Sequence, residues 1–266
     1  MSSRRVVLAG AVGLIVFGLV WELAVRVLDI RPFVLLAPSE IAQELASEPV
    51  RYLRAALVTA RHTVVGLGLA LMIAIVVGAA LGASRFLEHA VQPILILILV
   101  APWVAYFASI VVWLGRGDPP VIFLVAFVSM PGFVFAMVSG LRGADPAARE
   151  LLRSVDASRF EVLMRLRLPS ALPSLFATAR FSTGLALAAA YYGEGGNLAA
   201  EGLGYLGRRA ANAQNAPVLW ATVMATVGLG IALLVLIAAL ERWVLRWHVS
   251  QHVGDHLPVA PDRASP

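Results

Sequence analysis

The chain has 266 residues, of which 60% are hydrophobic and 14% are charged, and its mean hydropathy is +0.83. This composition excludes a soluble globular domain, in which about a quarter of the residues are charged. Because cysteine is absent, disulfides, thiolate nucleophiles and iron–sulfur clusters are excluded as well. All 21 basic residues are arginine, so a phosphate-binding loop ending in Gly-Lys-Ser/Thr cannot form, and any ATP used must be hydrolysed by another chain.

The chain is basic, with a net charge of +5 and a pI near 10.4. Its arginines alternate with apolar runs and form no groove interleaved with aromatic residues, as a nucleic-acid surface would require. We therefore interpret the basic balance as the arginine bias of membrane loops, and we expect no nucleic-acid partner.

Apolar stretches recur along the chain, and a bilayer core of about 30 Å needs about 20 helical residues. The first stretch extends past Glu22, and the fifth includes Arg180, whose side chain we expect to snorkel to the cytoplasmic surface. The pattern predicts an all-α membrane protein with six transmembrane helices, over residues 6–28, 62–84, 89–115, 119–141, 172–192 and 210–240.

Arginines in the short connections predict the orientation, since cytoplasmic loops are enriched in them. The first helix is expected to be retained rather than cleaved as a signal peptide, because no small-x-small site follows Trp21 and five further spans do. Both termini are then cytoplasmic, on the side that holds Arg4, Arg5, Arg85, the arginines from 142 to 167, Arg246 and Arg263.

Two segments lie outside the predicted spans. In the first, Ser39 is expected to cap a short surface helix over residues 40–46. In the C-terminal tail, His248, His252 and His256 repeat at a spacing seen in metal sites, but the glycine and prolines around them disfavour the helix that would align them. The expected parts are a first transmembrane helix (1–28), an outer loop (29–56), a core with five transmembrane helices (57–247) and a disordered cytoplasmic tail (248–266).

The segment 142–171, called here the loop 142–171, breaks the apolar pattern and has strong local signals. Asp145 before Pro146 is a helix N-cap with proline at the first helical position. Ser158 and Glu161 form a capping box for a second short helix, which Leu168-Pro169 is expected to end. The two helices should present apolar faces, the first made of Leu151, Leu152 and Val155 and the second of Phe160, Leu163 and Met164.

This loop resembles the cytoplasmic loop of ATP-binding-cassette importer permeases, which has the form Glu-Ala-Ala, three residues, Gly, nine residues, Ile-x-Leu-Pro. The chain matches that spacing with Glu150, Leu151 and Leu152, then Asp156, then Leu166-Arg167-Leu168-Pro169. Leucine replaces both alanines and the isoleucine, and Asp156 replaces the glycine. Because aspartate tolerates a left-handed backbone at a cost of about 1 kcal/mol, we expect the turn to be retained.

The resemblance extends over residues 30–250 and is closest to the nitrate, sulfonate, taurine and bicarbonate branch. It is carried by Leu-Ala-Pro-Ser at 36–39, Ala-Pro-Trp-Val-Ala at 101–105, Val-Trp-Leu-Gly at 112–115, Glu194 with Gly-Leu-Gly-Tyr-Leu at 202–206, and residues 240–247. It implies a bacterial inner-membrane permease with the type I, MetI-like architecture, which moves a small anion or organic nutrient. It also implies three partners, namely a separate ATPase, an extracytoplasmic binding protein and a second permease chain. The chain itself would then bind no cofactor, since ATP is held by the ATPase.

The resemblance also implies roles for individual residues. The loop 142–171 would dock on the ATPase through Glu150, Leu151, Leu152, Arg153, Val155, Asp156, Leu166, Leu168 and Pro169. Prolines and polar-tipped aromatic residues of broken spans are typical of a path or gate, although the aromatic residues also suit packing or an interfacial belt. The path candidates are Pro102, Trp103, Tyr106, Pro131, Tyr191, Tyr192, Glu194, Gly202 and Gly204.

Several alternatives stay open from the residues alone. His62 is more consistent with a boundary residue than with a proton relay, and Glu194, which could shape the outer gate, is at least as consistent with a solvated helix end. Gly202 and Gly204 are expected to allow a tight re-entrant turn, with a simple surface turn as the alternative. A secondary carrier or channel remains the rival function, although no ionisable residue lies deep in the third, fourth or sixth span. An enzyme is not expected, since neither His-Glu-x-x-His nor Gly-x-Ser-x-Gly occurs.

Overall fold

The computed structural model describes residues 3–197 and 201–246, which contain α-helices, one π-helical turn and no β-strand. The elements are α1 (Ser3–Val27), α2 (Pro38–Ser47), α3 (Pro49–Ala83), α4 (Arg85–Val100), α5 (Trp103–Leu114), α6 (Asp118–Arg142), α7 (Pro146–Ser154), α8 (Arg159–Val162), the π-helical turn η1 (Leu163–Arg167), α9 (Leu168–Gly196), α10 (Leu203–Asn212) and α11 (Ala216–Val244). The all-α class predicted from the sequence is confirmed.

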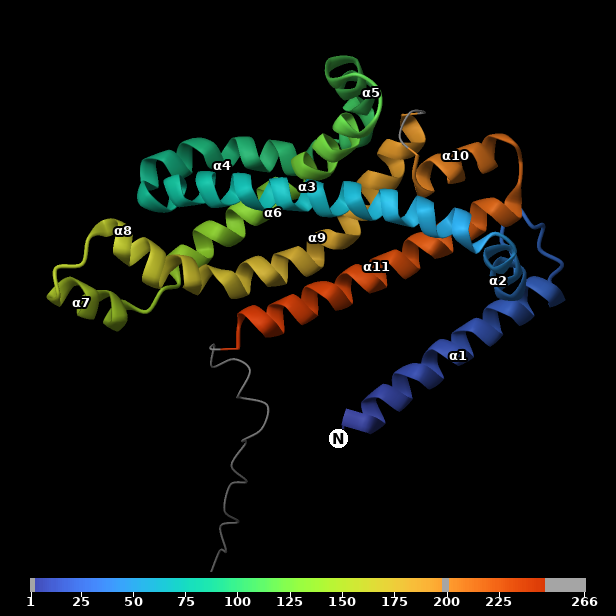
Figure 1. The fold of residues 1–266 in the computed structure, drawn as a ribbon, viewed down its shortest axis with the longest axis horizontal. Helices are drawn as coiled ribbons and strands as arrows, with labels where there is room; N and C mark the ends of the chain where they lie inside the picture. The colour runs from blue at the N-terminus through green and yellow to red at the C-terminus, as the bar shows by residue number, and fades with distance from the viewer. Residues whose placement is uncertain (1–2, 198–200, 247–266) are drawn as a thin grey trace, which may run out of the picture.

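Helix α6 is the centre of the bundle and packs between α3 and α9 (Figure 1). Small residues let these helices approach closely: a Cβ added at Gly66 of α3 would lie 2.5 Å from Val125 Cβ of α6. At the other end of the same interface, a Cβ at Gly78 would lie 2.5 Å from Met137 Cγ. Close backbone approach is the usual way in which membrane helices gain packing energy, because lipid supplies no hydrophobic drive between them.

Helix α1 lies apart from the bundle and contacts it through its C-terminal end (Figure 1). There the Glu22 carboxylate accepts hydrogen bonds from the Ser39 backbone N–H, at 3.0 Å, and the Ser39 hydroxyl, at 2.7 Å, while Arg26 donates to Glu22 at 2.6 Å. The prediction of a short helix after the first span is confirmed, but Ser39 as its N-cap is wrong. The cap residue is Ala37, with Pro38 at the first helical position, and Glu22 of α1 supplies the carboxylate that a capping side chain would.

Among residues 3–197 and 201–246, four helices are long and apolar enough to cross a membrane: α1 from Leu8, α3, α6 and α11. A fifth span arises if α4 and α5 are taken as one bent pair. The interruption that the sequence analysis placed at Pro102 within the span 89–115 is a sharp bend, since the chain turns by 99° between α4 and α5. Pro102 has no N–H for a helical hydrogen bond and forces Ala101 into an extended conformation, with φ −61° and ψ 134°.

Helix α9 has 29 residues and is joined to α11 by an ion pair. Arg180 Nη1 lies 2.9 Å from Glu241 Oε2, so the arginine has a specific partner that the sequence pattern did not indicate. The tail 248–266, with its three histidines, lies outside the described residues.

The packing of α3 on α6 generates a matched test. Gly66→Ala should lower the free energy of unfolding by about 1–3 kcal/mol, because the new methyl group overlaps Val125. Gly68→Ala, whose Cβ would meet no atom within 4 Å, should leave it unchanged. Thermal unfolding of both variants in the same detergent measures the difference, and equal melting temperatures would contradict the close approach.

Candidate functional site

The loop 142–171 is organised by its own capping residues, as the sequence predicted. Asp145 accepts a hydrogen bond from the Ala147 backbone N–H at 3.0 Å, and Pro146 occupies the first turn of α7. At α8, the Glu161 N–H donates to Ser158 Oγ at 3.2 Å, while the Ser158 N–H donates to Glu161 Oε2 at 2.9 Å. The second bond, with that from the Ser158 hydroxyl, lowers the pKa of the Glu161 carboxyl.

Asp156 makes the turn between the two loop helices. Its φ is +53°, so the left-handed backbone expected at this position is confirmed. The Ala157 N–H donates to the Leu152 carbonyl at 3.0 Å, and the Asp156 N–H donates to the Arg153 carbonyl at 3.1 Å. This pair of bonds is the Schellman pattern, with Asp156 in the place usually taken by glycine.

The second loop helix does not stop at Leu168-Pro169, so that part of the sequence prediction is wrong. Helix α8 passes through η1 directly into α9, and the Leu168 N–H donates to the Leu163 carbonyl five residues earlier. Pro169 lies in the first turn of α9, where a missing N–H is tolerated. The wider π turn also places Leu163 and Leu168 on one face, and both pack against the bundle core.

Leu163 therefore does not join the exposed apolar face, contrary to the sequence prediction. The face that is exposed is made of large apolar side chains without partners in the described chain. Their exposed fractions are 68% for Leu151, 67% for Val155, 68% for Phe160 and 49% for Met164. We call these four residues the loop apolar face.

A group of arginines lies beside the loop apolar face. Burial and the charges of Arg149 and Arg153 lower the pKa of the Arg167 guanidinium. An arginine stays protonated at neutral pH, so three positive charges remain close together, and an acidic partner surface would relieve their repulsion.

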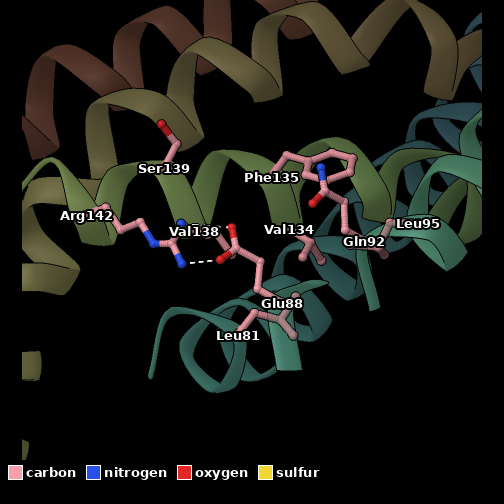
Figure 2. Close-up of a pocket in the computed structure, with 9 residues that line it drawn as sticks. All are labelled: Leu81, Glu88, Gln92, Leu95, Val134, Phe135, Val138, Ser139 and Arg142. Atoms are coloured by element: carbon pink, nitrogen blue, oxygen red, sulfur yellow. Dashed lines mark hydrogen bonds and ion pairs between the residues drawn. The ribbon is translucent and has the colours of Figure 1, made fainter. Parts of the chain in front are cut away.

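The base of the loop is tied to the bundle by an ion pair. Arg142, the last residue of α6, donates from Nη1 to Glu88 Oε1 of α4 at 2.9 Å, and from Nη2 to Oε2. Figure 2 shows the two side chains directed toward each other beside a cavity of about 290 Å³ between α3, α4 and α6. The bidentate pair fixes the end of α6 from which the loop begins.

A buried polar cluster lies at the opposite end of the bundle from the loop. His62 Nδ1 lies 2.8 Å from Glu194 Oε1, and His62 Nε2 lies 2.9 Å from Asp118 Oδ1. The Thr59 hydroxyl and the Gly204 N–H each donate to Glu194 Oε2 at 2.9 Å. We call Thr59, His62, Asp118 and Glu194 the Glu194 cluster; it joins α3, α6, α9 and α10.

The Glu194 cluster places one histidine between two carboxyl groups. A carboxylate oxygen can only accept a hydrogen bond, so a histidine with one carboxylate at each ring nitrogen carries protons on both. His62 is therefore an imidazolium between Glu194 and Asp118, and Asp118 also pairs with Arg61. Since the Glu194 and His62 side chains are both fully buried, the reading of Glu194 as a solvated helix end is wrong.

Glycines in and before α10 make room for this cluster. A Cβ at Gly202 would overlap the Glu194 carboxylate, and one at Gly204 would overlap the Tyr191 carbonyl. Neither glycine has a positive φ, since Gly115 and Gly117 are the positive-φ glycines recorded. Close packing of α10 on α9 is what requires glycine at these two positions, and the tight turn predicted for them stays a prediction.

The structure divides the predicted path residues into separate groups. Tyr191 packs beside α10, with its hydroxyl 3.1 Å from Thr222 Oγ1. Tyr192 meets Trp103 in an edge-to-face contact, with ring centroids 5.5 Å apart, just after the bend at Pro102. Tyr106 instead packs against Phe127, and Pro131 is buried midway along α6.

The sequence analysis missed Thr59 and Asp118, whose partners are far away in the chain. A signal was available for Asp118, which begins a helix as Asp-Pro-Pro. It was missing for Thr59, since an isolated threonine in an apolar helix usually bonds its own backbone.

Comparison with known proteins places this geometry in context. The family model described as binding-protein-dependent transport system inner membrane component matches residues 66–246. The chain is 28% identical over 231 residues to the formylaminopyrimidine transport permease protein ThiX of Halalkalibacterium halodurans, which covers 84% of this chain and 89% of that protein. It is 27% identical over 190 residues to the taurine transport system permease protein TauC of Escherichia coli, which covers 69% of each.

Solved structures agree in fold. A structure of the MetNI methionine ABC transporter in inward-facing conformations matches with a TM-score of 0.64 at 20% identity, covering 74% of this chain and 98% of that one. A structure of an amino acid ABC transporter with histidines matches with a TM-score of 0.57 at 13% identity, covering 76% and 96%. At these identities the likeness shows the fold alone.

The charge assignment of the Glu194 cluster predicts a large effect of one atom. Glu194→Gln should destabilise the protein by about 3–5 kcal/mol, because it leaves the buried His62 imidazolium facing an amide. The control, Glu201→Gln, changes an exposed carboxylate and should have no effect. The double variant with His62→Gln should lose less than the sum of the two single variants, since removing both charges restores neutrality. Thermal unfolding in detergent compares the three single variants and the double variant with the wild type, and strict additivity would refute the pairing.

The left-handed turn predicts opposite effects of two substitutions. Asp156→Gly should leave loop stability unchanged or raise it by about 1 kcal/mol, because glycine adopts a positive φ without strain. Asp156→Val should lower it by more than that, because a β-branched residue is strained there. Limited proteolysis of the loop ranks the three proteins, and Asp156→Val as protected as wild type would contradict the turn.

Proposed function

The chain belongs to the family of binding-protein-dependent transport system inner membrane components, a family of transport permeases and not of enzymes, and from this premise we propose that it is the permease subunit of an ATP-driven importer coupled to a separate ATPase by the loop 142–171. The observation that carries the proposal is the loop apolar face. It places four large apolar side chains, 49–68% exposed, on a rigid, fully capped pair of helices.

The loop apolar face and the charged residues around it, together called the docking surface, have the composition of a protein–protein interface. Apolar residues at the centre and charged residues at the rim are the usual composition of a protein interface. Here Leu151 and Val155 would enter an apolar groove of the ATPase, and Glu150 and Arg153 would set the orientation at its rim. Arg149, Arg153 and Arg167 would face acidic groups, which favours a partner with negative charge beside the groove. The chain itself is proposed to bind no cofactor, because ATP belongs to the ATPase.

We also propose six spans with both termini in the cytoplasm. The bent pair of α4 and α5 is taken as one span. Helix α9 is taken as the fifth span along the chain, before α11, since at 1.5 Å per residue its 29 residues extend about 43 Å. Arg180 is a charged residue within α9, which an ordinary apolar span would lack. Its ion pair with Glu241 neutralises this charge and so supports the assignment of α9 as a span. The arginine-rich loop 142–171 is then cytoplasmic, and the Glu194 cluster lies at the outer end.

The Glu194 cluster is proposed to hold the outer gate. Alternating access requires the outer ends of the helices to take two discrete arrangements. A neutral network with every donor and acceptor paired makes the observed arrangement well defined. Helix α10, held by Glu194 through the Gly204 N–H, would move with α9 when the ATPase changes state.

An extracytoplasmic binding protein and a second permease chain are proposed as the remaining partners. The relatives are named for formylaminopyrimidine, taurine, nitrate and aliphatic sulfonates, which supports a small anion or organic nutrient as the solute. The rival function, a carrier that works without an ATPase, is disfavoured because the family is dependent on binding proteins.

Co-purification tests the coupling assignment. Leu151→Asp combined with Val155→Asp should abolish recovery of the ATPase with the full-length chain in mild detergent, since two charges would have to be buried without partners. The control is Phe86→Asp, which changes an even more exposed apolar residue outside the loop and should leave recovery intact. An ATPase that is retained by the double variant would overturn the docking surface.

Insertion of residues between Glu150 and Pro169 should likewise uncouple ATP-driven uptake without unfolding the helices.

A further inference from the structure

Hydroxyl groups within the long helices divide into two groups. Six of them donate to a backbone carbonyl three or four residues earlier, as isolated hydroxyls in membrane helices usually do; these are Thr63, Ser170, Ser174, Thr183, Thr222 and Thr226. Thr59 donates to Glu194. Ser129 is different, because its Oγ is buried and has no hydrogen-bond partner in the described chain. Three further hydroxyls also form no side-chain hydrogen bond among the described residues. Ser139 is exposed near the loop end of α6 and lines the cavity beside Arg142, whereas Thr178 and Ser182 share a cavity with Ser129.

The hydroxyls of Ser129, Thr178 and Ser182 line the same cavity. It has a volume of about 360 Å³, lies between α4, α6 and α9, and is bounded by Leu99, Val128, Ser129, Gly132, Ala177, Thr178, Phe181, Ser182 and Leu185. Gly132 forms its floor, since a Cβ there would lie 3.7 Å from Thr178 Cγ2 and 3.9 Å from Ser182 Oγ. The absence of that side chain leaves room in front of the hydroxyls.

The cavity lies midway along the helices that form it. At 1.5 Å per residue, Ser129 is about 16 Å from Asp118 at the start of α6, and Ser182 is about 21 Å from Leu168 at the start of α9. Since the bilayer core is about 30 Å thick, both hydroxyls are near its middle. A buried hydroxyl at that depth without a partner requires an explanation, because each such group costs about 1–3 kcal/mol.

We propose that this cavity is a binding site for the translocated solute and that it selects an uncharged, polar organic molecule over an anion. The proposal rests on the permease function proposed above and adds the position and the chemical class of the site. The solute would complete the hydrogen bonds of Ser129, Thr178 and Ser182, and its apolar part would lie against Phe181 and Leu99.

The lining chemistry decides the class. Hydroxyls donate and accept hydrogen bonds, so they suit amide, amine, carbonyl and hydroxyl groups alike. No residue that bounds the cavity is ionisable, and moving an anion from water into such a site without a counter-charge costs several kcal/mol. The volume is within the range of about 300–1,000 Å³ typical of small-molecule sites.

The natural absence of cysteine allows a direct test. Single cysteines are introduced as Ser129→Cys, Ser182→Cys and Thr183→Cys in the full-length chain in lipid nanodiscs. Each is labelled with two thiosulfonate reagents of equal length, 2-hydroxyethyl methanethiosulfonate, which is uncharged, and 2-sulfonatoethyl methanethiosulfonate, an anion. Rates are measured by mass spectrometry and divided by the rate of each reagent with a free thiol in buffer.

Thr183→Cys is the matched control, because Thr183 is adjacent to Ser182, is also buried and is bonded to the Ala179 carbonyl instead of facing the cavity. Ala46→Cys, on the exposed surface of α2, calibrates unrestricted access. We expect the uncharged reagent to label Ser182→Cys and Ser129→Cys at least about tenfold faster than Thr183→Cys, and about tenfold faster than the anion does. At Ala46→Cys the two reagents should react equally.

Two outcomes would overturn the site. Equal normalised rates for both reagents at Ser182→Cys would show that the cavity admits anions, and labelling no faster than at Thr183→Cys would show that it admits no solute. Either result leaves recovery of the ATPase with the same cysteine variants unchanged, so the permease function would stand. If no ATPase co-purifies with the wild-type chain, the proposed function itself is refuted.

Discussion

A fully buried carboxylate is the constraint on which the arrangement of the helices depends. Glu194 has no access to solvent, so every hydrogen bond that it accepts must come from the protein, and its charge needs a buried cation. The donors that meet this need, Thr59, His62 and the Gly204 N–H, come from α3 and α10, and His62 brings in Asp118 of α6. Four helices must therefore converge at one level of the bundle, and α10 must approach α9 closely enough that no side chain fits at Gly204.

The opposite end of the bundle follows a different principle. The loop 142–171 is held by bonds between residues close in sequence: the Asp145 cap, the Schellman turn at Asp156 and the capping box of Ser158 and Glu161. Its side chains bury little, so local bonding is what keeps it rigid, and the Arg142–Glu88 pair fixes its starting point. One end of the helical bundle is thus held together by a polar network between residues far apart in the sequence. The other end has a locally folded projection with an exposed apolar face. This contrast is what an interface for a separate subunit requires, because the binding surface is then largely preformed.

The same contrast decides how much was predictable from the sequence. Asp145, Asp156 and the capping box were readable because each signal and its partner lie within five residues, and the spacing of these residues also carried the family resemblance. The Glu194 cluster was not readable, since 132 residues separate His62 from Glu194 and nothing local distinguishes a paired carboxylate from a solvated one. The interruption at Pro102 was readable but the size of its bend was not, and the helix stop expected at Pro169 was misjudged, for a related reason. A proline in the sequence shows which backbone hydrogen bond is missing. Only the surrounding packing determines whether the helix breaks there, as at Pro102, or continues, as at Pro169.

Helix α9 connects these features into one body. It begins where η1 leaves the loop 142–171, carries Thr178 and Ser182 near its middle, and ends at Glu194 and Gly196 (Figure 1). It is one helix of 29 residues in which Pro173 is the one position after the first turn that lacks an N–H, so a displacement of the loop end is carried along the helix beyond Pro173. Because Pro173 lies near the loop end, any flexing of α9 is confined there, below the hydroxyl-lined cavity. A force applied by an ATPase at Leu151 and Val155 would therefore act on the cavity and on the Glu194 cluster together, which is the mechanical condition for opening one side of a path while closing the other.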